Sequence, residues 1–449
     1  MEGLSSTSLL TDMYELTMVD AAILDGTASR HSVFEVFARR LPGSRRYGVV
    51  AGTSRVLEAI RDFHFTDEQI EWLRSKNILH DETLDFLKNY HFSGNVYGYP
   101  EGELYFPYSP IFTVEGTFAQ ACVLETVVLS ILNHDSAVAT AASRMTMAAH
   151  GRPCMDFGAR RTHEEAAIHA ARAAMIAGFV GTSDLEAGMR YDIPISGTAA
   201  HSFTLLHDSE EEAFASQIST MGTDTTLLVD TFDIPHGVEL AVQAARAAGG
   251  ELGGVRIDSG DLVSQAFKVR EQLDAMGATS TRITVTSDLD EYSIAALNAA
   301  PADAYGVGTR MVTGSGHPTA EMVYKLVLRE GDDGSMVPVA KRSQAKATVG
   351  GFKVAGRVRD EYGRAAQELV VEAESYEEGL DYIKKVGARP LQAHLVIDGE
   401  IDPEYIGNHT IADGAKRHEE ARNALPGDGW RLSEGAPAVP TKMLNLHEA

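Results

Sequence analysis

The amino-acid sequence predicts an α/β barrel joined to a smaller α+β domain. From residue 153 onward, a short apolar run, a polar or glycine-containing loop and a helical stretch follow one another seven times. Successive units of this kind are typical of a parallel β-sheet. Chemically useful side chains end the short runs, as they do in barrels whose loops at that face carry the chemistry. A doubly wound open sheet remains as the alternative. The runs end at residues 155–158, 179–182, 193–196, 227–230, 255–258, 284–287 and 304–307.

The chain outside these units has a different pattern of apolar and polar residues. Residues 31–117 contain β-like runs broken by helix-like stretches at Gly52–Phe63 and Asp67–Tyr90, which indicates a small α+β domain. Alanine-rich amphipathic segments at Ala119–Asn133 and Ser136–His150 predict two helices. We therefore expect domains at residues 1–117, 118–335 and 336–449, the last of them returning to the first.

Composition narrows the class of protein. The 449 residues are 44% hydrophobic and 23% charged, as in an ordinary globular protein, and the formal net charge is −25. A negative far field disfavours sequence-independent binding to nucleic acid or to an anionic membrane, so local basic clusters must hold any anionic ligand. Cys122 and Cys154 show no metal-binding spacing and are expected to be buried free thiols. The N-terminus has no basic leader and no apolar run approaches ~20 residues, so we expect a cytoplasmic protein without a membrane span.

The string Arg256-Ile257-Asp258-Ser259-Gly260-Asp261 is the strongest chemical signal, because it lies where a buried run becomes a helix. Two carboxylates and a guanidinium at a strand end could bind ribose hydroxyls, a metal ion and a substrate carboxylate. A structural role is also open, with Ser259 as the N-cap and Asp261 compensating the helix dipole. The two roles are compatible.

Three further strings carry weaker signals. Tyr305–Arg310 contains a Gly-x-Gly turn, whose exposed backbone amides can wrap a phosphate. Phe157–His163 combines an aromatic ring with adjacent arginines, which suit a planar heterocycle and phosphate oxygens, or else form a core Phe followed by solvated arginines. His201 is one of 16 histidines, and its position after the third run makes it a candidate for the site.

Taken in order, six strings resemble the nicotinate phosphoribosyltransferases, a type II phosphoribosyltransferase family, and the match runs from Thr11 to about Lys353. The resemblance implies an incomplete, seven-stranded α/β barrel with a sandwich-like N-terminal domain, in a homodimer whose active sites lie at the subunit interface. The six strings are Thr11–Met18, Phe157–Arg161, Gly181–Ser183, Gly197–Ser202, Arg256–Asp261 and Tyr305–Thr309.

The activity that the resemblance implies joins nicotinate to phosphoribosyl pyrophosphate and makes nicotinate mononucleotide for NAD synthesis, coupled to ATP hydrolysis. Tyr14 of the partner chain and Phe157 would stack on the two faces of the pyridine ring. Arg256 would bind the substrate carboxylate, and Arg160 and Lys325 would hold pyrophosphate or phosphate oxygens.

The resemblance also assigns the sugar and phosphate contacts. Asp258 would bind ribose hydroxyls and, with Asp230, support the Mg²⁺ that the pyrophosphate carries. His201 matches the histidine that ATP transiently phosphorylates in this family. Gly306, Gly308 and Thr309 would cradle the 5′-phosphate. We expect a basic run to close over the phosphates; it consists of Lys341, Lys346 and Lys353.

One loop bears on substrate choice. Ser183 favours a carboxylate substrate, because nicotinamide-using relatives carry Asp there to accept the amide N–H. Asp184 departs from the Asn of many family members, so its charge must point away from the site or the preference for the acid is in doubt. The alternatives are a nicotinamide phosphoribosyltransferase, a quinolinate-using relative and a non-catalytic nucleotide-binding protein on the same fold.

Overall fold

The computed structural model describes residues 6–341 and 349–447, and its internal contacts divide the chain into two compact units. Unit 1 comprises residues 1–140 and 319–449, and unit 2 comprises residues 141–318. The expected boundaries, after residues 117 and 335, differ from this division. One reason is that β11 (Met322–Glu330) pairs with β1 (His31–Ala38) inside unit 1.

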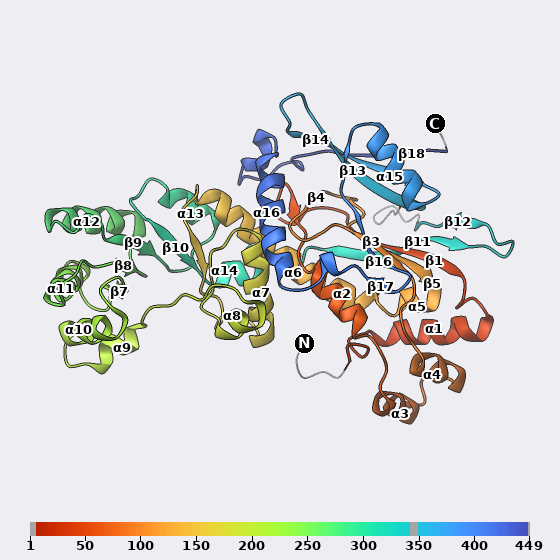
Figure 1. Ribbon diagram of the computed structural model, residues 1–449, viewed down its shortest axis with the longest axis horizontal. Helices are drawn as coiled ribbons and strands as arrows, with labels where there is room; N and C mark the ends of the chain where they lie inside the picture. Colours follow the sequence, from red (N-terminus) through yellow and green to blue (C-terminus); the bar gives the residue numbers. More distant parts are fainter. Residues whose placement is uncertain (1–5, 342–348, 448–449) are drawn as a thin grey trace. The chain divides into compact units, whose positions relative to one another are not determined.

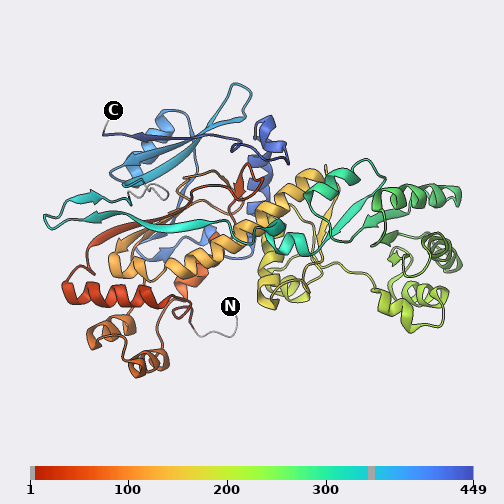
Figure 2. The same ribbon diagram turned by 180° about the vertical axis from the view of Figure 1, so that it is seen from behind.

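Unit 1 is built on an antiparallel seven-stranded sheet with the order β12-β11-β1-β5-β3-β16-β17 (Figure 1). β1 is buried along almost its whole length, because helices cover one face of the sheet and a second sheet supplies apolar side chains to the other. Figure 2 shows α1 (Met13–Asp25) alongside these strands. The other strands are β3 (Asn95–Gly98), β5 (Phe112–Thr117), β12 (Met336–Pro338), β16 (Ala393–Ile397) and β17 (Glu400–Ile401).

A second sheet of four strands, β15-β13-β14-β18, completes unit 1 together with the small pair β2 (Gly48–Val49) and β4 (Leu104–Tyr105). Its strands are β13 (Phe352–Arg359), β14 (Ala365–Ala373), β15 (Arg389–Pro390) and β18 (Thr441–Asn445). The helices of unit 1 are α1, α2 (Thr53–Arg61), α3 (Asp67–Lys76), α4 (Asp81–Lys88), α5 (Phe118–Cys122), α15 (Tyr376–Lys385) and α16 (His409–Asn423). The stretch predicted as one helix over 67–90 is two, since Asn77 takes a left-handed conformation at the C-cap of α3.

Helix α6 (Glu125–Ala148) spans the boundary between the units and replaces most of the two helices predicted over 119–150. The polar residues at 133–136 do not interrupt it, because the helix buries Asp135 and Ser136. The helical stretch Phe118–Ala148 is long and apolar enough to cross a membrane, but 67% of its apolar window is buried inside the protein. That burial is typical of a core helix.

Unit 2 contains a parallel sheet with the order β6-β10-β9-β8-β7. Its strands are β6 (Cys154–Asp156), β7 (Thr226–Leu228), β8 (Gly254–Ile257), β9 (Arg282–Val285) and β10 (Ala304–Val307). The second and third predicted runs form only single parallel bridges, from Asp156 to Thr182 and from Thr182 to Ile195. Pro194 explains part of this difference, because proline cannot donate to a ladder.

Helices follow the strand ends throughout unit 2, as the sequence predicts. They are α7 (Glu164–Ile176), α8 (Leu185–Tyr191), α9 (His201–Leu206), α10 (Glu210–Met221), α11 (Ile234–Ala247), α12 (Leu262–Ala275), α13 (Glu291–Leu297) and α14 (Thr309–Val312). The carboxyl ends of parallel strands lie along one edge of the sheet, so the loops that lead into these helices gather there.

Candidate active site

A cavity of about 430 Å³ opens at the carboxyl edge of the parallel sheet in unit 2. Eight of the residues predicted to form the site line it, so the loops after separate strands converge as expected. These eight are Phe157, Arg160, Ser183, Arg256, Asp258, Gly306, Gly308 and Thr309. The other lining residues are Arg161, Gly197, Thr198, Ala199, Ala200, Thr286, Ser287 and Asp288.

Arg256 presents a cation to this cavity from β8. Its Nη1 donates to Thr198 Oγ1 at 2.5 Å, which fixes one end of the guanidinium. Its Nε is buried and has no hydrogen-bond partner among the described residues. Burial lowers the pKa of Arg256, with Arg160 acting in the same direction while Asp258 and Asp230 oppose it. The site therefore holds a desolvated guanidinium whose donors are only partly used.

Asp230 and Asp258 are joined by hydrogen bonds at the ends of β7 and β8. Asp230 Oδ2 accepts from the backbone N–H of Asp258 at 2.9 Å and from the Ser259 hydroxyl at 2.7 Å. Asp258 Oδ1 accepts from the Thr286 hydroxyl. The N-cap of α12 is Asp261, which accepts from Ser264 N–H at 3.2 Å. The structural role expected for Ser259 as that cap is therefore wrong, because its hydroxyl bonds to Asp230.

His201 lies beside Asp230 but does not line the cavity. It is the first residue of α9, and its Nδ1 shares a hydrogen bond with Thr231 Oγ1 at 3.1 Å. Its Nε2 is 3.9 Å from Asp230 Oδ1, with the His201 side chain 41% exposed and that of Asp230 only 1% exposed. Asp230 Oδ1 has no hydrogen-bond partner among the described residues. An accessible imidazole thus lies next to a buried, incompletely satisfied carboxylate.

The ring of Phe157 packs against β10 because Gly306 has no side chain. A Cβ at Gly306 would lie 2.6 Å from two carbons of the Phe157 ring and 2.6 Å from Thr286 Cγ2. Phe157 N–H also donates to Val307 O at 2.8 Å. Gly306 therefore positions the aromatic ring, a packing role in addition to the phosphate contact expected for it.

Ser183 and Asp184 face different surroundings. Ser183 lines the cavity, whereas the Asp184 carboxylate accepts from Ala187 N–H at 2.9 Å and caps α8. The Asp184 N–H in turn donates to Thr182 Oγ1 at 3.0 Å. The negative charge that departs from the family pattern is thus used at a helix N-terminus, where a carboxylate is favourable.

Two predicted substrate-binding residues belong to unit 1. Tyr14 is in the first turn of α1 and is 44% exposed, and burial together with the Glu125 carboxylate raises its pKa. Lys325 lies on β11, with its Nζ 3.4 Å from Glu125 Oε1. Tyr14 and Lys325 therefore share Glu125 as a partner, a residue to which sequence reasoning assigned no role.

The predicted basic run does not form one surface. Lys341 is exposed, and Lys346 lies outside the described residues. Lys353 is buried in β13, where its Nζ lies 3.0 Å from Glu35 Oε2 and 3.1 Å from Gly351 O. The expectation that Lys353 closes over phosphates is wrong, because a buried ammonium that is already paired would have to leave its partner to reach a ligand.

The acidic residues of the site fit a Mg²⁺ ion that arrives with its substrate. Among the described residues, none of the His, Cys, Asp and Glu side chains form a group of three that could hold a metal ion. Mg²⁺ usually keeps several waters and binds through one or two carboxylates plus substrate phosphates. The unpartnered Oδ1 of Asp230 and the neighbouring Asp258 offer such a partial set.

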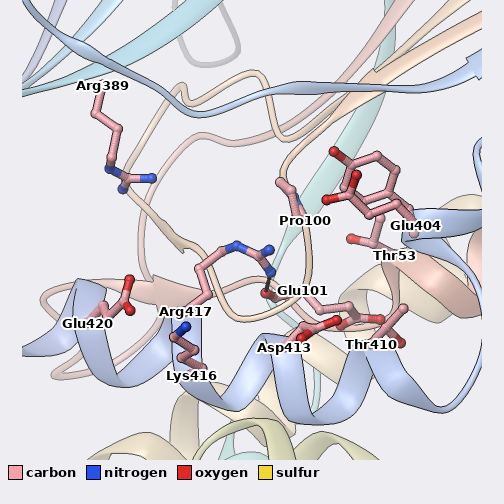
Figure 3. A pocket seen from close by; sticks show the side chains of 11 residues that line it. Thr53, Pro100, Glu101, Arg389, Glu404, Thr410, Asp413, Lys416, Arg417 and Glu420 are labelled. Carbon is pink, nitrogen blue, oxygen red and sulfur yellow. Dashed lines mark hydrogen bonds between the residues drawn. The ribbon is translucent and has the colours of Figure 1, made fainter.

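A second cavity, of about 360 Å³, lies in unit 1 beside α16 and contains no residue predicted for the site (Figure 3). Arg389 contacts both oxygens of Glu103 at 2.8 and 3.0 Å, and Arg417 donates to the backbone oxygen of Glu101 at 2.6 Å. Acidic side chains also line it, namely Glu404, Asp413 and Glu420. Engaged arginines among carboxylates suit an anionic substrate less well than the unit 2 cavity does.

Sequence reasoning missed four residues at the edge of unit 2. Thr198 orients Arg256, and Thr286 donates to Asp258. Ser287 lines the cavity with a φ of 131°, a conformation that non-glycine residues rarely adopt. Asp156 is 1% exposed, and burial raises its pKa to about 6. Three of the four end a predicted run, so their position was the signal that could have found them.

Comparison with known proteins identifies the family. The nicotinate phosphoribosyltransferase (NAPRTase) N-terminal domain matches residues 9–133, and the nicotinate phosphoribosyltransferase (NAPRTase) family matches residues 153–348. Nicotinate phosphoribosyltransferase pncB1 of Mycobacterium tuberculosis is 50% identical over 444 residues, which cover 97% of this chain and 95% of the relative. The nicotinate phosphoribosyltransferase of Bacillus subtilis is 38% identical over 361 residues, covering 79% of this chain and 73% of the relative.

Solved structures share the fold. Human nicotinic acid phosphoribosyltransferase superposes with a TM-score of 0.81 at 22% identity, over 97% of both chains. Nicotinate-nucleotide pyrophosphorylase from Pyrococcus furiosus superposes with a TM-score of 0.73 at 24% identity, over 92% of this chain and 96% of the other. The family matches reach into both units, and a relative at 50% identity covers nearly the whole chain. This protein belongs to the nicotinate phosphoribosyltransferase family.

Proposed function

We propose that this protein is a nicotinate phosphoribosyltransferase of NAD biosynthesis, which makes nicotinate mononucleotide and pyrophosphate from nicotinate and phosphoribosyl pyrophosphate. The observation that carries the proposal is Arg256, a half-buried guanidinium in the same cavity as Phe157 and Ser183, whose Nε has no hydrogen-bond partner within residues 6–341 and 349–447. A guanidinium recognises a carboxylate through two parallel hydrogen bonds, and an aromatic face suits the attached ring. The 50% identical relative bears the same activity in its name.

The chemistry requires little from the protein beyond positioning and charge. The ring nitrogen of nicotinate already has a lone pair, so the attack on the ribose C1 needs no general base. Arg256 fixes the rotation of the ring while Phe157 holds one of its faces. As the C1–O bond breaks, negative charge develops on pyrophosphate, and Arg160 stabilises it at the cavity wall. Asp258 accepts hydrogen bonds from the ribose hydroxyls.

The remaining contacts hold the two ends of phosphoribosyl pyrophosphate. Gly308 and Thr309, at the turn after β10, offer backbone N–H groups to the 5′-phosphate. Mg²⁺, bound with the pyrophosphate and held by Asp230 and Asp258, would supply positive charge to the leaving group. Lys325 would hold phosphate oxygens, as the family resemblance implies, and its Nζ lies within 3.4 Å of Glu125.

ATP coupling is proposed to proceed through His201. Its imidazole is 41% exposed and therefore open to a phosphoryl donor, and its Nε2 lies 3.9 Å from the Asp230 carboxylate, which can orient the ring. His201→Ala should abolish ATP hydrolysis and leave slow, ATP-independent synthesis, because the pyridine nitrogen of nicotinate reacts inside the cavity, which His201 does not line. Normal stimulation by ATP in the purified variant would assign His201 a structural role only.

A homodimer with shared active sites is proposed from the surface of α1. Its exposed side chains include Met13 at 58%, Tyr14 at 44% and Met18 at 41%, an apolar face that a second copy would cover. Mixing Tyr14→Ala chains with Asp258→Ala chains should restore activity, because one site of each heterodimer would then be intact. Absence of recovery, with subunit exchange demonstrated, would remove Tyr14 from the partner's site.

The order of the parallel strands in unit 2 supports the proposed barrel. Taking the bridges with the strands, the order in space is Ile195, Thr182, β6, β10, β9, β8 and β7. This is the cyclic order of seven successive parallel strands with one break between the third and the fourth, which supports an incomplete α/β barrel.

The proposed location of the enzyme is the cytoplasm. Both cysteines are free, which fits a reducing compartment.

Substrate choice gives the deciding experiment. The wild-type enzyme should convert nicotinate in the presence of phosphoribosyl pyrophosphate, Mg²⁺ and ATP, with mass detection of the mononucleotide, and should use nicotinamide poorly. Ser183→Asp adds a charge that repels the carboxylate, so the ratio of kcat/KM for the two pyridines should move by at least about a decade. Asp184→Asn is the matched control, and it should leave the ratio unchanged because Asp184 caps α8.

A further inference from the structure

The carboxylate of Asp156 joins two loops that line the active-site cavity without lining the cavity itself. Its Oδ1 accepts from Gly158 N–H at 2.7 Å, in the loop that carries Phe157. Its Oδ2 accepts from the Thr182 hydroxyl at 2.7 Å, next to Ser183. Asp156 is 1% exposed and Thr182 is fully buried, so water does not compete for these bonds.

Backbone bonds give the same two loops a common register. Asp156 N–H donates to Gly181 O at 2.9 Å, and Ser183 N–H donates to Asp156 O at 2.9 Å. The Thr182 hydroxyl also accepts from Asp184 N–H at 3.0 Å, so it links Asp156 to the start of α8. With only single bridges in this part of the sheet, these bonds replace a longer strand ladder.

The loop on the other side of Asp156 has no room for a side chain at Gly158. A Cβ at Gly158 would lie 3.0 Å from Asp156 Oδ1 and 2.2 Å from Val312 Cγ1, so the backbone there is pressed between the carboxylate and α14. Phe157 is held between this turn and β10. Asp156 therefore connects the residue that stacks on the ring with the residue that selects its substituent.

We propose that Asp156 is a positioning residue that sets the gap between the Phe157 ring and Ser183, through its bond to Thr182, and so determines the preference for a pyridine carboxylate. This inference rests on the proposed function. Each hydrogen bond of the Asp156 carboxylate acts on a different loop. The bond from Gly158 N–H holds the loop that carries Phe157, and the bond from the Thr182 hydroxyl holds the loop that carries Ser183. Only the second bond is needed for the choice between acid and amide.

Three variants test the Thr182 bond. Thr182→Val removes the hydroxyl at nearly constant shape, Asp156→Asn keeps an acceptor for Gly158 N–H while replacing the oxygen that faces Thr182, and Thr182→Ser keeps the bond. We expect Thr182→Val and Asp156→Asn each to lower the ratio of kcat/KM for nicotinate to that for nicotinamide about 10-fold, and to change KM for phosphoribosyl pyrophosphate by less than about 3-fold. Thr182→Ser should behave as the wild type, and the double variant Asp156→Asn/Thr182→Val should be no worse than the poorer single variant.

An unchanged ratio of kcat/KM for the two pyridines, an equal loss for nicotinate and nicotinamide, or additive effects in the double variant would each overturn the proposal. Should Asp156→Asn fail to fold, judged by circular dichroism and thermal melting, the comparison of Thr182→Val with Thr182→Ser still decides it. Failure of the proposed function is distinct, because the wild-type enzyme would then form no nicotinate mononucleotide.

Discussion

Replacement of Arg256 by lysine should separate charge from geometry in the recognition of nicotinate. The wild-type guanidinium donates to Thr198 from one nitrogen, and its buried Nε has no hydrogen-bond partner in the part of the chain that the structure describes. A carboxylate that binds there gains donors that are already desolvated and oriented. Lysine keeps a positive charge in Arg256→Lys but cannot present a planar fork.

The magnitude follows from the number of bonds lost. A hydrogen bond to a charged group contributes about 1.5–3 kcal/mol, and about 1.4 kcal/mol corresponds to a factor of ten. Loss of one such bond should lower kcat/KM for nicotinate about 10- to 100-fold. Thr198→Val leaves the fork in place and removes only the group that orients Arg256, so its effect should be smaller.

The assay compares steady-state kcat/KM for nicotinate and nicotinamide across these two variants and the wild type. Because nicotinamide carries no carboxylate, Arg256→Lys should affect its use much less than that of nicotinate. Equal falls for the two pyridines, in variants whose melting temperatures match the wild type, would refute the assignment of Arg256 to the carboxylate. A larger fall with Thr198→Val than with Arg256→Lys would refute the supporting role of Thr198.

Two further predictions concern stability. Lys353→Met should cost about 3–5 kcal/mol in urea denaturation, because it leaves the Glu35 carboxyl, at 4% side-chain exposure, without its ammonium partner, and Glu35→Leu in the same chain should recover much of the loss. Burial raises the pKa of Glu15 to about 7 from an ordinary value of 4.5, so the folded state binds more protons than the unfolded state between these values. Stability should therefore fall as the pH rises through this window, by a few kcal/mol at most, and Glu15→Gln should flatten the profile. An unchanged profile in Glu15→Gln would contradict the linkage.

The location of the site in unit 2 could be predicted because parallel strands end at one edge. Phe157, Ser183, Arg256, Asp258 and Gly306 end or directly follow predicted runs, and all five line the cavity. The spacing of a βα pattern is enough to bring such residues together, without any knowledge of side-chain conformations.

Roles that depend on one position along a helix start could not be predicted. Ser259 and Asp261 both have side chains that cap helices well, and the structure gives the cap to Asp261 while Ser259 bonds to Asp230. The choice depends on where α12 begins, and a sequence pattern places a helix boundary only to within about two to four residues. For Asp184, the sequence left open whether its charge disfavours a carboxylate substrate. The structure shows that this carboxylate caps α8 instead of lining the cavity.

Contacts within unit 1 could not be predicted from the sequence for a different reason. Tyr14 and Lys325 meet at Glu125 because α1, α6 and β11 come from distant parts of the chain. The antiparallel register of β11 against β1 aligns Lys325 with Glu35, and no local pattern specifies that alignment. The burial of Lys353 could not be predicted for the same reason. A run of basic residues indicates an exposed surface, and only the tertiary structure shows that Lys353 is buried beside Glu35.

The formal net charge of −25 makes the use of carboxylates around the cavity the central electrostatic question for an anionic substrate. The Asp184 carboxylate accepts from a backbone N–H at a helix start, and that of Asp156 accepts from Gly158 and Thr182. Asp230 Oδ2 accepts from a backbone N–H and a serine hydroxyl. Hydrogen bonds to these carboxylates reduce the negative potential that they project into the cavity, whereas the Nε of Arg256 has no hydrogen-bond partner among the described residues. An anion-binding site inside a strongly negative protein can therefore combine the arginines that line the cavity with neutral donors that engage the nearby carboxylates.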